Sequence, residues 1–156
     1  MRKHSLLYVM ALLFLITGCS NSKHGNSLMI TLESSYPINE TISRFTQAIE
    51  KKGYRVTKTT DHTARAKKED IYLHPTLSLT LDKPKVFSAL LTCNPSLAID
   101  LPIRVVAYSQ LGGAVSFSYT QPEYWSLKHN VKDKNCIAVI LEMTREFNEA
   151  VEVLKK

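Results

Sequence analysis

The segment Thr76-Leu77-Ser78-Leu79-Thr80-Leu81 decides the fold, because its side chains alternate strictly between hydroxyl and apolar. Successive side chains of a β-strand point to opposite faces of the sheet. The three leucines would therefore face a hydrophobic core, while the three hydroxyl side chains would face away from it. A strand of this kind belongs to a sheet that is covered on one face only.

The same alternation recurs along the chain, separated by stretches with helical spacing. Residues 101–107 and 115–119 alternate on either side of Gly112-Gly113, which predicts a hairpin. Apolar side chains at every third or fourth position from 38 to 49 predict an amphipathic helix with Asn39 as its cap. The other predicted elements are strands at 28–32 and 54–60, a helix between Asp82 and Asn94, and a long helix after Lys134. The order β-α-β-β-α-β-β-α predicts an α+β domain, with a curved, mainly antiparallel sheet and helices on one face.

Residues 1–18 are typical of a bacterial signal peptide. A short basic start precedes an uncharged apolar run at 5–16, which is shorter than the roughly 20 residues that a transmembrane helix needs. The following Ile16-Thr17-Gly18-Cys19 resembles the lipobox of bacterial lipoproteins. The resemblance implies that the preceding peptide is removed and that the Cys19 thiol carries a diacylglycerol, with further acyl chains such as palmitate. A membrane-anchored or buried helix that ends in Gly-Cys is the alternative.

Residues 19–27 are predicted to form a lipidated tether, and residues 28–156 a single domain. The tether is polar and has no hydrophobic period. A flexible tether of this length spans about 15 Å, so the domain would lie close to the membrane. Ser20, in place of an aspartate after the lipidated cysteine, favours the outer membrane, with the domain facing the periplasm.

The charge pattern argues against a nucleic-acid-binding protein. The formal net charge is +6, and removal of the signal peptide with Arg2 and Lys3 would lower it by two. Basic side chains are interspersed with acidic ones, and the one dense basic patch is Arg65, Lys67 and Lys68. A nucleic-acid reader would show a basic stripe with aromatic or motif support. The expected partner is instead the membrane, through the lipid on Cys19.

Two cysteines, Cys93 and Cys136, remain once Cys19 is lipidated. An exported protein enters an oxidising compartment, where these two can pair in a disulfide. The alternative is that each is a small buried apolar residue. Sequence spacing does not decide between them, because pairing depends on the distance in the fold.

Asp61-His62 is the sharpest candidate polar site. An imidazole beside a carboxylate can act as a general base or as an oriented metal ligand. Adjacent residues need not face one another, however, and Asp61 could cap a turn while His62 makes local contacts. The other histidines lack metal-ligand spacing, so neither a metal nor another cofactor is expected. Asp100, beside Pro102, is interpreted as a turn residue at the start of a strand.

Three aromatic residues, Tyr119, Tyr124 and Trp125, form a second candidate site. If exposed, they would make a binding patch for a partner, a ligand or the membrane interface. If buried, they would form a lid over one end of the core. Both interpretations fit the sequence.

Several short segments, in this order, resemble the domain-of-unknown-function family 302. They are Ile30-Thr31-Leu32-Glu33-Ser34, Lys52-Gly53-Tyr54, Asp61-His62 with Ala66, Lys83-Pro84-Lys85 and the stretch Asn94–Pro102. The resemblance implies a compact TBP-like α+β domain, often a homodimer, with no established catalytic residues. The chain departs from the family at Leu81-Asp82, where Phe-Gly is usual.

The sequence therefore predicts a membrane-anchored envelope protein whose domain binds a small ligand or another envelope protein without catalysis. The alternative is an envelope enzyme or a redox or metal protein that uses Asp61, His62, Cys93 and Cys136. A purely structural assembly unit is a third hypothesis.

Overall fold

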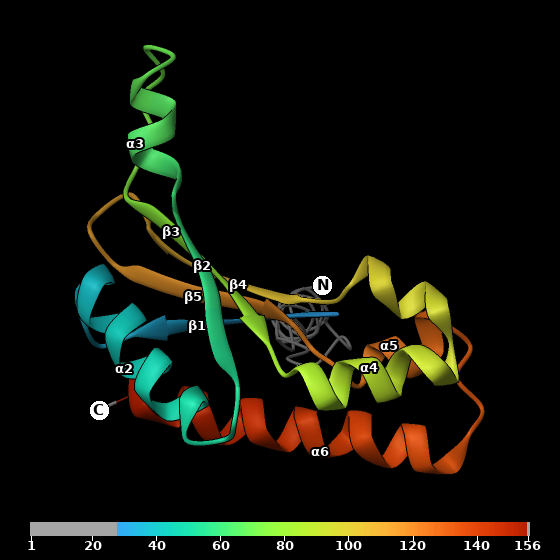
Figure 1. Ribbon diagram of the computed structural model, residues 1–156. Helices are drawn as coiled ribbons and strands as arrows, with labels where there is room; N and C mark the ends of the chain where they lie inside the picture. The colour runs from blue at the N-terminus through green and yellow to red at the C-terminus, as the bar shows by residue number, and fades with distance from the viewer. Residues whose placement is uncertain (1–27, 156) are drawn as a thin grey trace, which may run out of the picture.

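Five strands form one antiparallel sheet in the order β1-β5-β4-β3-β2 (Figure 1). The fold comes from a computed structural model, which describes residues 28–155. The strands are β1 (Met29–Ser34), β2 (Arg55–Asp61), β3 (Thr76–Asp82), β4 (Ile103–Ser109) and β5 (Val115–Thr120). The β4–β5 hairpin turns at Gly112 and Gly113, whose φ angles of 95° and 88° lie in the region that favours glycine.

The helices pack on one face of the sheet and leave the other face open (Figure 1). The three long helices are α2 (Ile38–Glu50), α4 (Pro84–Cys93) and α6 (Lys134–Val151). Short helices are α3 (His62–Lys67) and α5 (Tyr124–Lys128), with 3₁₀ turns η1 (Pro95–Ile99) and η2 (Glu152–Leu154). The predicted fold class, an α+β domain with an open antiparallel sheet, is confirmed.

Two predicted helix caps are wrong. Helix α2 begins after Pro37, so Asn39 lies inside its first turn and caps nothing. Helix α4 begins after Lys83, because Asp82 is the last residue of β3 and its carboxylate lies 3.5 Å from the Arg55 guanidinium. In both cases a proline fixes the backbone at the helix start, and no side-chain cap is formed.

The alternation that decides the fold has the predicted outcome. Leu79 and Leu81 are fully buried between the sheet and the helices, whereas Leu77 is half-buried near the end of β3. Phe45 of α2 packs on Phe117 of β5, with ring centroids 4.6 Å apart. Each such side chain stabilises the fold by roughly 1.5–3 kcal/mol on burial. Because this packing covers one face of the sheet with helices, the side chains on the other face remain accessible to solvent or to a ligand.

No helix within residues 28–155 has the length and apolar character needed to cross a bilayer. The predicted signal peptide, the predicted lipidation at Cys19 and the predicted tether all lie outside the described residues.

Candidate ligand-binding site on the open sheet face

A groove of about 400 Å³ lies on the open face of the sheet. Its floor carries small hydroxyl side chains from two strands, namely Thr76 and Ser78 of β3 and Ser118 and Thr120 of β5. Apolar Met29 and Leu73 line its rim, together with His62 and Arg104. The groove exists because the sheet buries the leucines of β3 on one face and turns the hydroxyl residues to the other.

His62 is placed at the groove by the start of α3. Asp61 ends β2, and its carboxylate accepts a hydrogen bond of 2.8 Å from the Ala64 N–H, which caps the helix. The imidazole Nε2 of His62 lies 2.8 Å from the Ser78 hydroxyl. The structure thus brings His62 to the groove and directs Asp61 to the backbone of α3. The two residues do not form an acid–base pair in the described part of the chain.

The segment from α3 to β3 projects from the body of the molecule as an arm (Figure 1). Thr63 closes its base, because its hydroxyl donates to the His74 carbonyl at 3.1 Å and accepts from the Thr76 N–H at 2.9 Å. At the turn, Asp70 adopts a positive φ of 56°, and the Ile71 N–H bonds the Ala66 carbonyl. The arm therefore returns with Leu73 at the rim of the groove.

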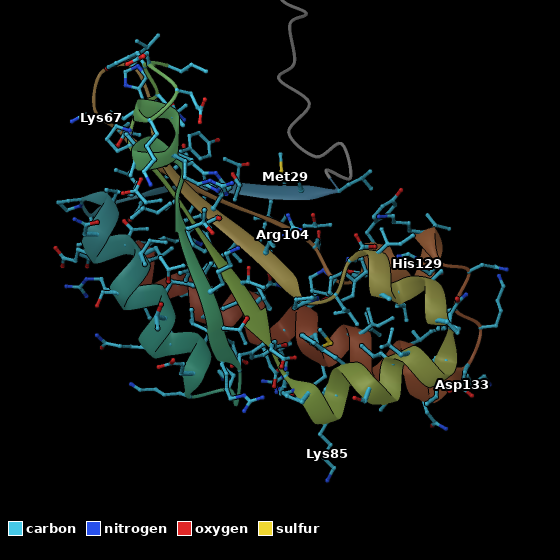
Figure 2. All side chains as sticks on the ribbon, turned by 45° about the horizontal axis from the view of Figure 1, so that its top comes forward. Met29, Lys67, Lys85, Arg104, His129 and Asp133 are labelled. Atoms are coloured by element: carbon cyan, nitrogen blue, oxygen red, sulfur yellow. A yellow bond between two sulfur atoms is a disulfide. The ribbon has the colours of Figure 1, made fainter. Side chains whose placement is uncertain are left out.

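Arg104 supplies a positive charge at the groove on the open face. It lies on β4, where the alternation of residues 103–107 turns it away from the buried Ile103 and Val105. Figure 2 shows Arg104 and Met29 on the same open side of the sheet. Arg104 is exposed and forms no salt bridge with any residue in the range 28–155. An unpaired guanidinium beside hydroxyl groups can hold an anion.

Sequence reasoning missed Arg104 as a candidate functional residue, although a signal was present. The alternating pattern at 101–107 places it at a polar position of a half-buried strand. What the pattern lacks is the strand order, which brings β4 between β5 and β3 and so sets Arg104 among their hydroxyl side chains.

The three aromatic candidates do not form an exposed patch. Trp125 and Tyr119 are buried, with exposed fractions of 1% and 2%, while Tyr124 is half-buried. Burial raises the pKa of Tyr119 to about 12, and its hydroxyl lies 3.3 Å from the Asn148 side-chain oxygen. The exposed-patch interpretation is therefore wrong for Tyr119 and Trp125. Their rings are buried and form part of the core, in keeping with the alternative of a lid over one end of the core.

A polar network around the buried side chain of His129 joins η1 to α5. The Ser96 hydroxyl lies 2.8 Å from Nδ1 of His129, and Nε2 of His129 lies 2.5 Å from the Asp100 carboxylate. Lys128 also donates to Asp100 at 2.9 Å. Burial alone would raise the pKa of the Asp100 carboxyl, but the hydrogen bonds from Lys128 and His129 outweigh it and hold the pKa below its ordinary value.

This network resembles a nucleophile–base–acid relay, but its surroundings serve a structural purpose. Asn94 accepts from the Ser96 N–H at 2.9 Å through its side chain and from the Leu97 N–H at 3.1 Å through its carbonyl. These two backbone donors are therefore not available to stabilise an oxyanion beside Ser96. Asn94 also donates to the His129 carbonyl at 2.6 Å. The contacts together fix the η1 segment against α5.

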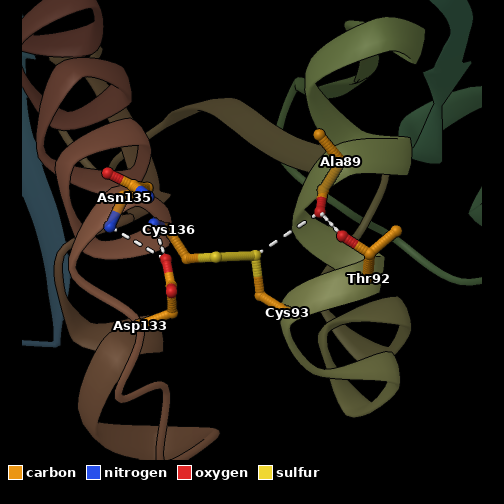
Figure 3. The surroundings of a disulfide bond; sticks show 6 residues. All are labelled: Ala89, Thr92, Cys93, Asp133, Asn135 and Cys136. Carbon is orange, nitrogen blue, oxygen red and sulfur yellow. Dashed lines mark hydrogen bonds between the residues drawn. A yellow bond between two sulfur atoms is a disulfide. The ribbon is translucent and has the colours of Figure 1, made fainter.

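Cys93 and Cys136 form a disulfide between α4 and α6 (Figure 3). Their Cα atoms are 6.3 Å apart, within the usual range for a disulfide. Asp133 caps α6 by accepting from the Asn135 and Cys136 N–H groups, each at 2.9 Å, and this fixes the first turn that carries Cys136. The bond joins α4 to α6, and both helices lie away from α3 (Figure 1). The structure therefore does not bring the cysteines and Asp61-His62 into one site.

Within residues 28–155, no group of three or more histidine, cysteine, aspartate or glutamate side chains is arranged to hold a metal ion. The chemistry that the open face offers is hydrogen bonding and positive charge, since the register places Lys58 and Arg104 on either side of Thr80 on this face.

The fold and groove define an α+β domain with one helical layer and an open, polar sheet face. Residues 30–154 match the family described as Domain of unknown function DUF302, and the chain belongs to that family. The crystal structure of an uncharacterized conserved DUF302 protein from Bacillus stearothermophilus is similar, with a TM-score of 0.72 at 18% identity. The match covers 81% of this chain and 98% of that one, and at this identity it establishes the fold.

Longer proteins also contain a related segment. The chain is 27% identical over 114 residues to proteins named Fluoride-specific ion channel FluC 1 from Brucella suis and Brucella abortus. The match covers 73% of this chain but 45% and 42% of those proteins, so the chain spans less than half the length of these relatives.

Proposed function

We propose that this protein is a lipid-anchored protein of the bacterial cell envelope, and that it binds a small ligand on the open face of its sheet without catalysing a reaction. The observation that carries the proposal is the groove of about 400 Å³, in which hydroxyl side chains surround His62 and the unpaired Arg104. Its size is within the range of sites for small molecules.

The groove selects a ligand with two chemical parts. Ser78 and Ser118 offer hydroxyl groups that are already oriented, because Ser78 bonds His62 and Ser118 bonds Thr31 at 2.8 Å. Met29 and Leu73 offer apolar contact at the rim. We therefore expect a molecule with oxygen acceptors and an apolar portion, since such a molecule uses both kinds of contact.

Three observations support an envelope location. The lipobox-like segment at 16–19 follows an apolar run of the right length. The disulfide between Cys93 and Cys136 is of a kind that persists in oxidising compartments. A segment similar to this chain also occurs in proteins named as ion channels, which fits a domain that works beside a membrane. Formation of a homodimer, attachment to the outer membrane and binding of another envelope protein are further proposals.

The anchor is tested by mass spectrometry of the protein purified from the envelope. The expected mass is that of residues 19–156 with a diacylglycerol and an acyl chain, and Cys19→Ala should lack the lipid mass. A wild-type mass that shows neither loss of residues 1–18 nor an added lipid would contradict the anchor.

The binding role is tested by native mass spectrometry of the same preparation. A retained small molecule should be present in the wild type, lost in Arg104→Gln and kept in Lys85→Gln. Lys85 is a matched control because it is exposed and points away from the open face (Figure 2). Retention that is equal in all three proteins would place the ligand elsewhere and refute the open-face site.

A further inference from the structure

Trp125 carries the one side-chain polar atom in the described residues that is buried without a hydrogen-bond partner. Its indole nitrogen Nε1 has no acceptor, although the residue is only 1% exposed. The other buried polar rings are satisfied, as Tyr54 shows by donating to Glu146 at 2.9 Å. An indole N–H can only donate, and leaving a buried donor unpaired costs about 1–3 kcal/mol. Such an exception calls for an explanation, and an acceptor from a bound molecule is one that the structure can be searched for.

A second depression adjoins this indole ring. It has a volume of about 300 Å³ and is lined by the segment from Ala98 to Arg104, by Thr120 and by Trp125. Arg104 and Thr120 also line the groove described above, so the two depressions meet along these residues. The open face thus has one extended concave surface, with Leu73 and His62 at one end and Trp125 at the other.

The charges around the second depression favour an anion. The one carboxylate in its lining, Asp100, is already bound by Lys128 at 2.9 Å and by His129. Arg104 has no such partner in the part of the chain that the structure describes. A guanidinium forms paired hydrogen bonds with the two oxygens of a carboxylate, and a further N–H donor can bind the same group.

We propose that the second depression is the subsite for the acidic end of the ligand, where Arg104 and the Trp125 indole N–H hold a carboxylate. The apolar part of the ligand lies in the adjoining groove, against Leu73 and Met29. The ligand class is therefore a small organic acid with an aliphatic portion. This inference rests on the proposed open-face binding function and adds to it the chemical class and the residues that select it.

The test uses the full-length protein and hexanoate, with hexanamide as the uncharged analogue of the same shape. Trp125 is the only tryptophan in the chain, so its fluorescence reports on the subsite directly. Hexanoate should change this fluorescence in a saturable way, and hexanamide should bind at least tenfold more weakly. Arg104→Met should weaken hexanoate binding at least tenfold and remove the preference for the acid, because a charged hydrogen bond is lost. Lys85→Met should bind like the wild type.

Trp125→Phe tests the indole donor, with calorimetry as the measurement because this variant has no tryptophan. It should bind hexanoate about tenfold more weakly while its circular dichroism stays that of the wild type. If Trp125→Phe misfolds, methyl-group NMR of the wild type decides, since hexanoate should then shift signals of Leu101 and Ile103 beside the depression.

Three results would overturn the inference. One is equal binding of acid and amide, and the second is wild-type affinity in a folded Trp125→Phe variant, which would mean that water satisfies the indole. The third is no binding of hexanoate. In each case the open-face function would still stand if native mass spectrometry found a small molecule whose retention depends on Arg104. If hexanoate does not bind and native mass spectrometry finds no retained small molecule, both the proposed function and this inference are refuted.

Discussion

Removal of the Cys93–Cys136 disulfide should cost about 4 kcal/mol of unfolding free energy. The bond closes a loop with a sequence separation of 43 residues. In the chain-entropy description, the cross-link lowers the entropy of the unfolded chain by an amount that grows with the logarithm of the loop length, which gives about 4 kcal/mol at 25 °C for this loop. Typical domains have only about 5–15 kcal/mol in total, so the loss would be large.

The measurement is urea denaturation of the wild type and of the Cys93→Ala/Cys136→Ala double variant, with Trp125 fluorescence as the signal that monitors unfolding. This signal is suitable because Trp125 is buried and becomes exposed on unfolding. Lys85→Met serves as the control, since this exposed side chain lies outside the cross-link and the variant keeps Cys93 and Cys136. A reducing agent should lower the stability of the wild type to that of the double variant and leave the double variant unchanged. A loss below about 1 kcal/mol would refute the entropic reasoning, because the unfolded chain would then be restrained without the bond.

Three other predictions concern single residues. Lys83→Met should lower the free energy of unfolding by about 3 kcal/mol in chemical denaturation, because the buried carboxylate of Glu146 loses the ammonium group 2.6 Å away. Lys52→Met, which removes an exposed ion pair, should cost less than about 1 kcal/mol. Equal losses in the two variants would contradict this reasoning. Asp70→Gly should raise the thermal midpoint slightly, by up to about 1 kcal/mol in stability, because φ at this turn is 56°; a lower midpoint would show that the Asp70 side chain stabilises the arm. The lowered pKa of Asp100 stabilises the fold above the ordinary carboxyl pKa of about 4, and this contribution is lost as the pH falls through the lower, folded-state value. Asp100→Asn should therefore be less stable than wild type at pH 7 and nearly equal to it at pH 2, and a difference that does not change with pH would refute the charge-based explanation.

Most of the fold could be predicted from the sequence because it depends on local periodicity. The alternation at 76–81 and the glycine pair at 112–113 each report a backbone geometry that neighbouring residues determine. The helix starts were less predictable, since Pro37 and Lys83 take positions that a capping side chain was expected to hold.

The candidate site was only partly predictable, because it depends on contacts between distant segments. His62 reaches Ser78 through the arm, and Asp100 meets His129 across 29 positions of sequence. The pairing of Cys93 with Cys136 likewise depends on how α4 and α6 pack. No pattern in a single segment indicates that Trp125 is buried with an unpaired nitrogen, since that requires the positions of η1, β4 and β5 around it.

The position of β1 has a consequence for how the chain folds during synthesis or export. Among the strands of residues 28–155, β1 comes first in the chain, yet the one strand it pairs with there is β5, with Met29 opposite Thr120 and Ser34 opposite Val115. When the chain emerges N-terminus first, β1 therefore lacks its partner β5 until roughly ninety further residues have emerged. The Ser35 N–H also bonds the Leu154 carbonyl, so the two ends of the domain close together last. Any factor that binds the nascent protein would encounter β1 as an exposed, β-prone segment for almost the whole time of its emergence.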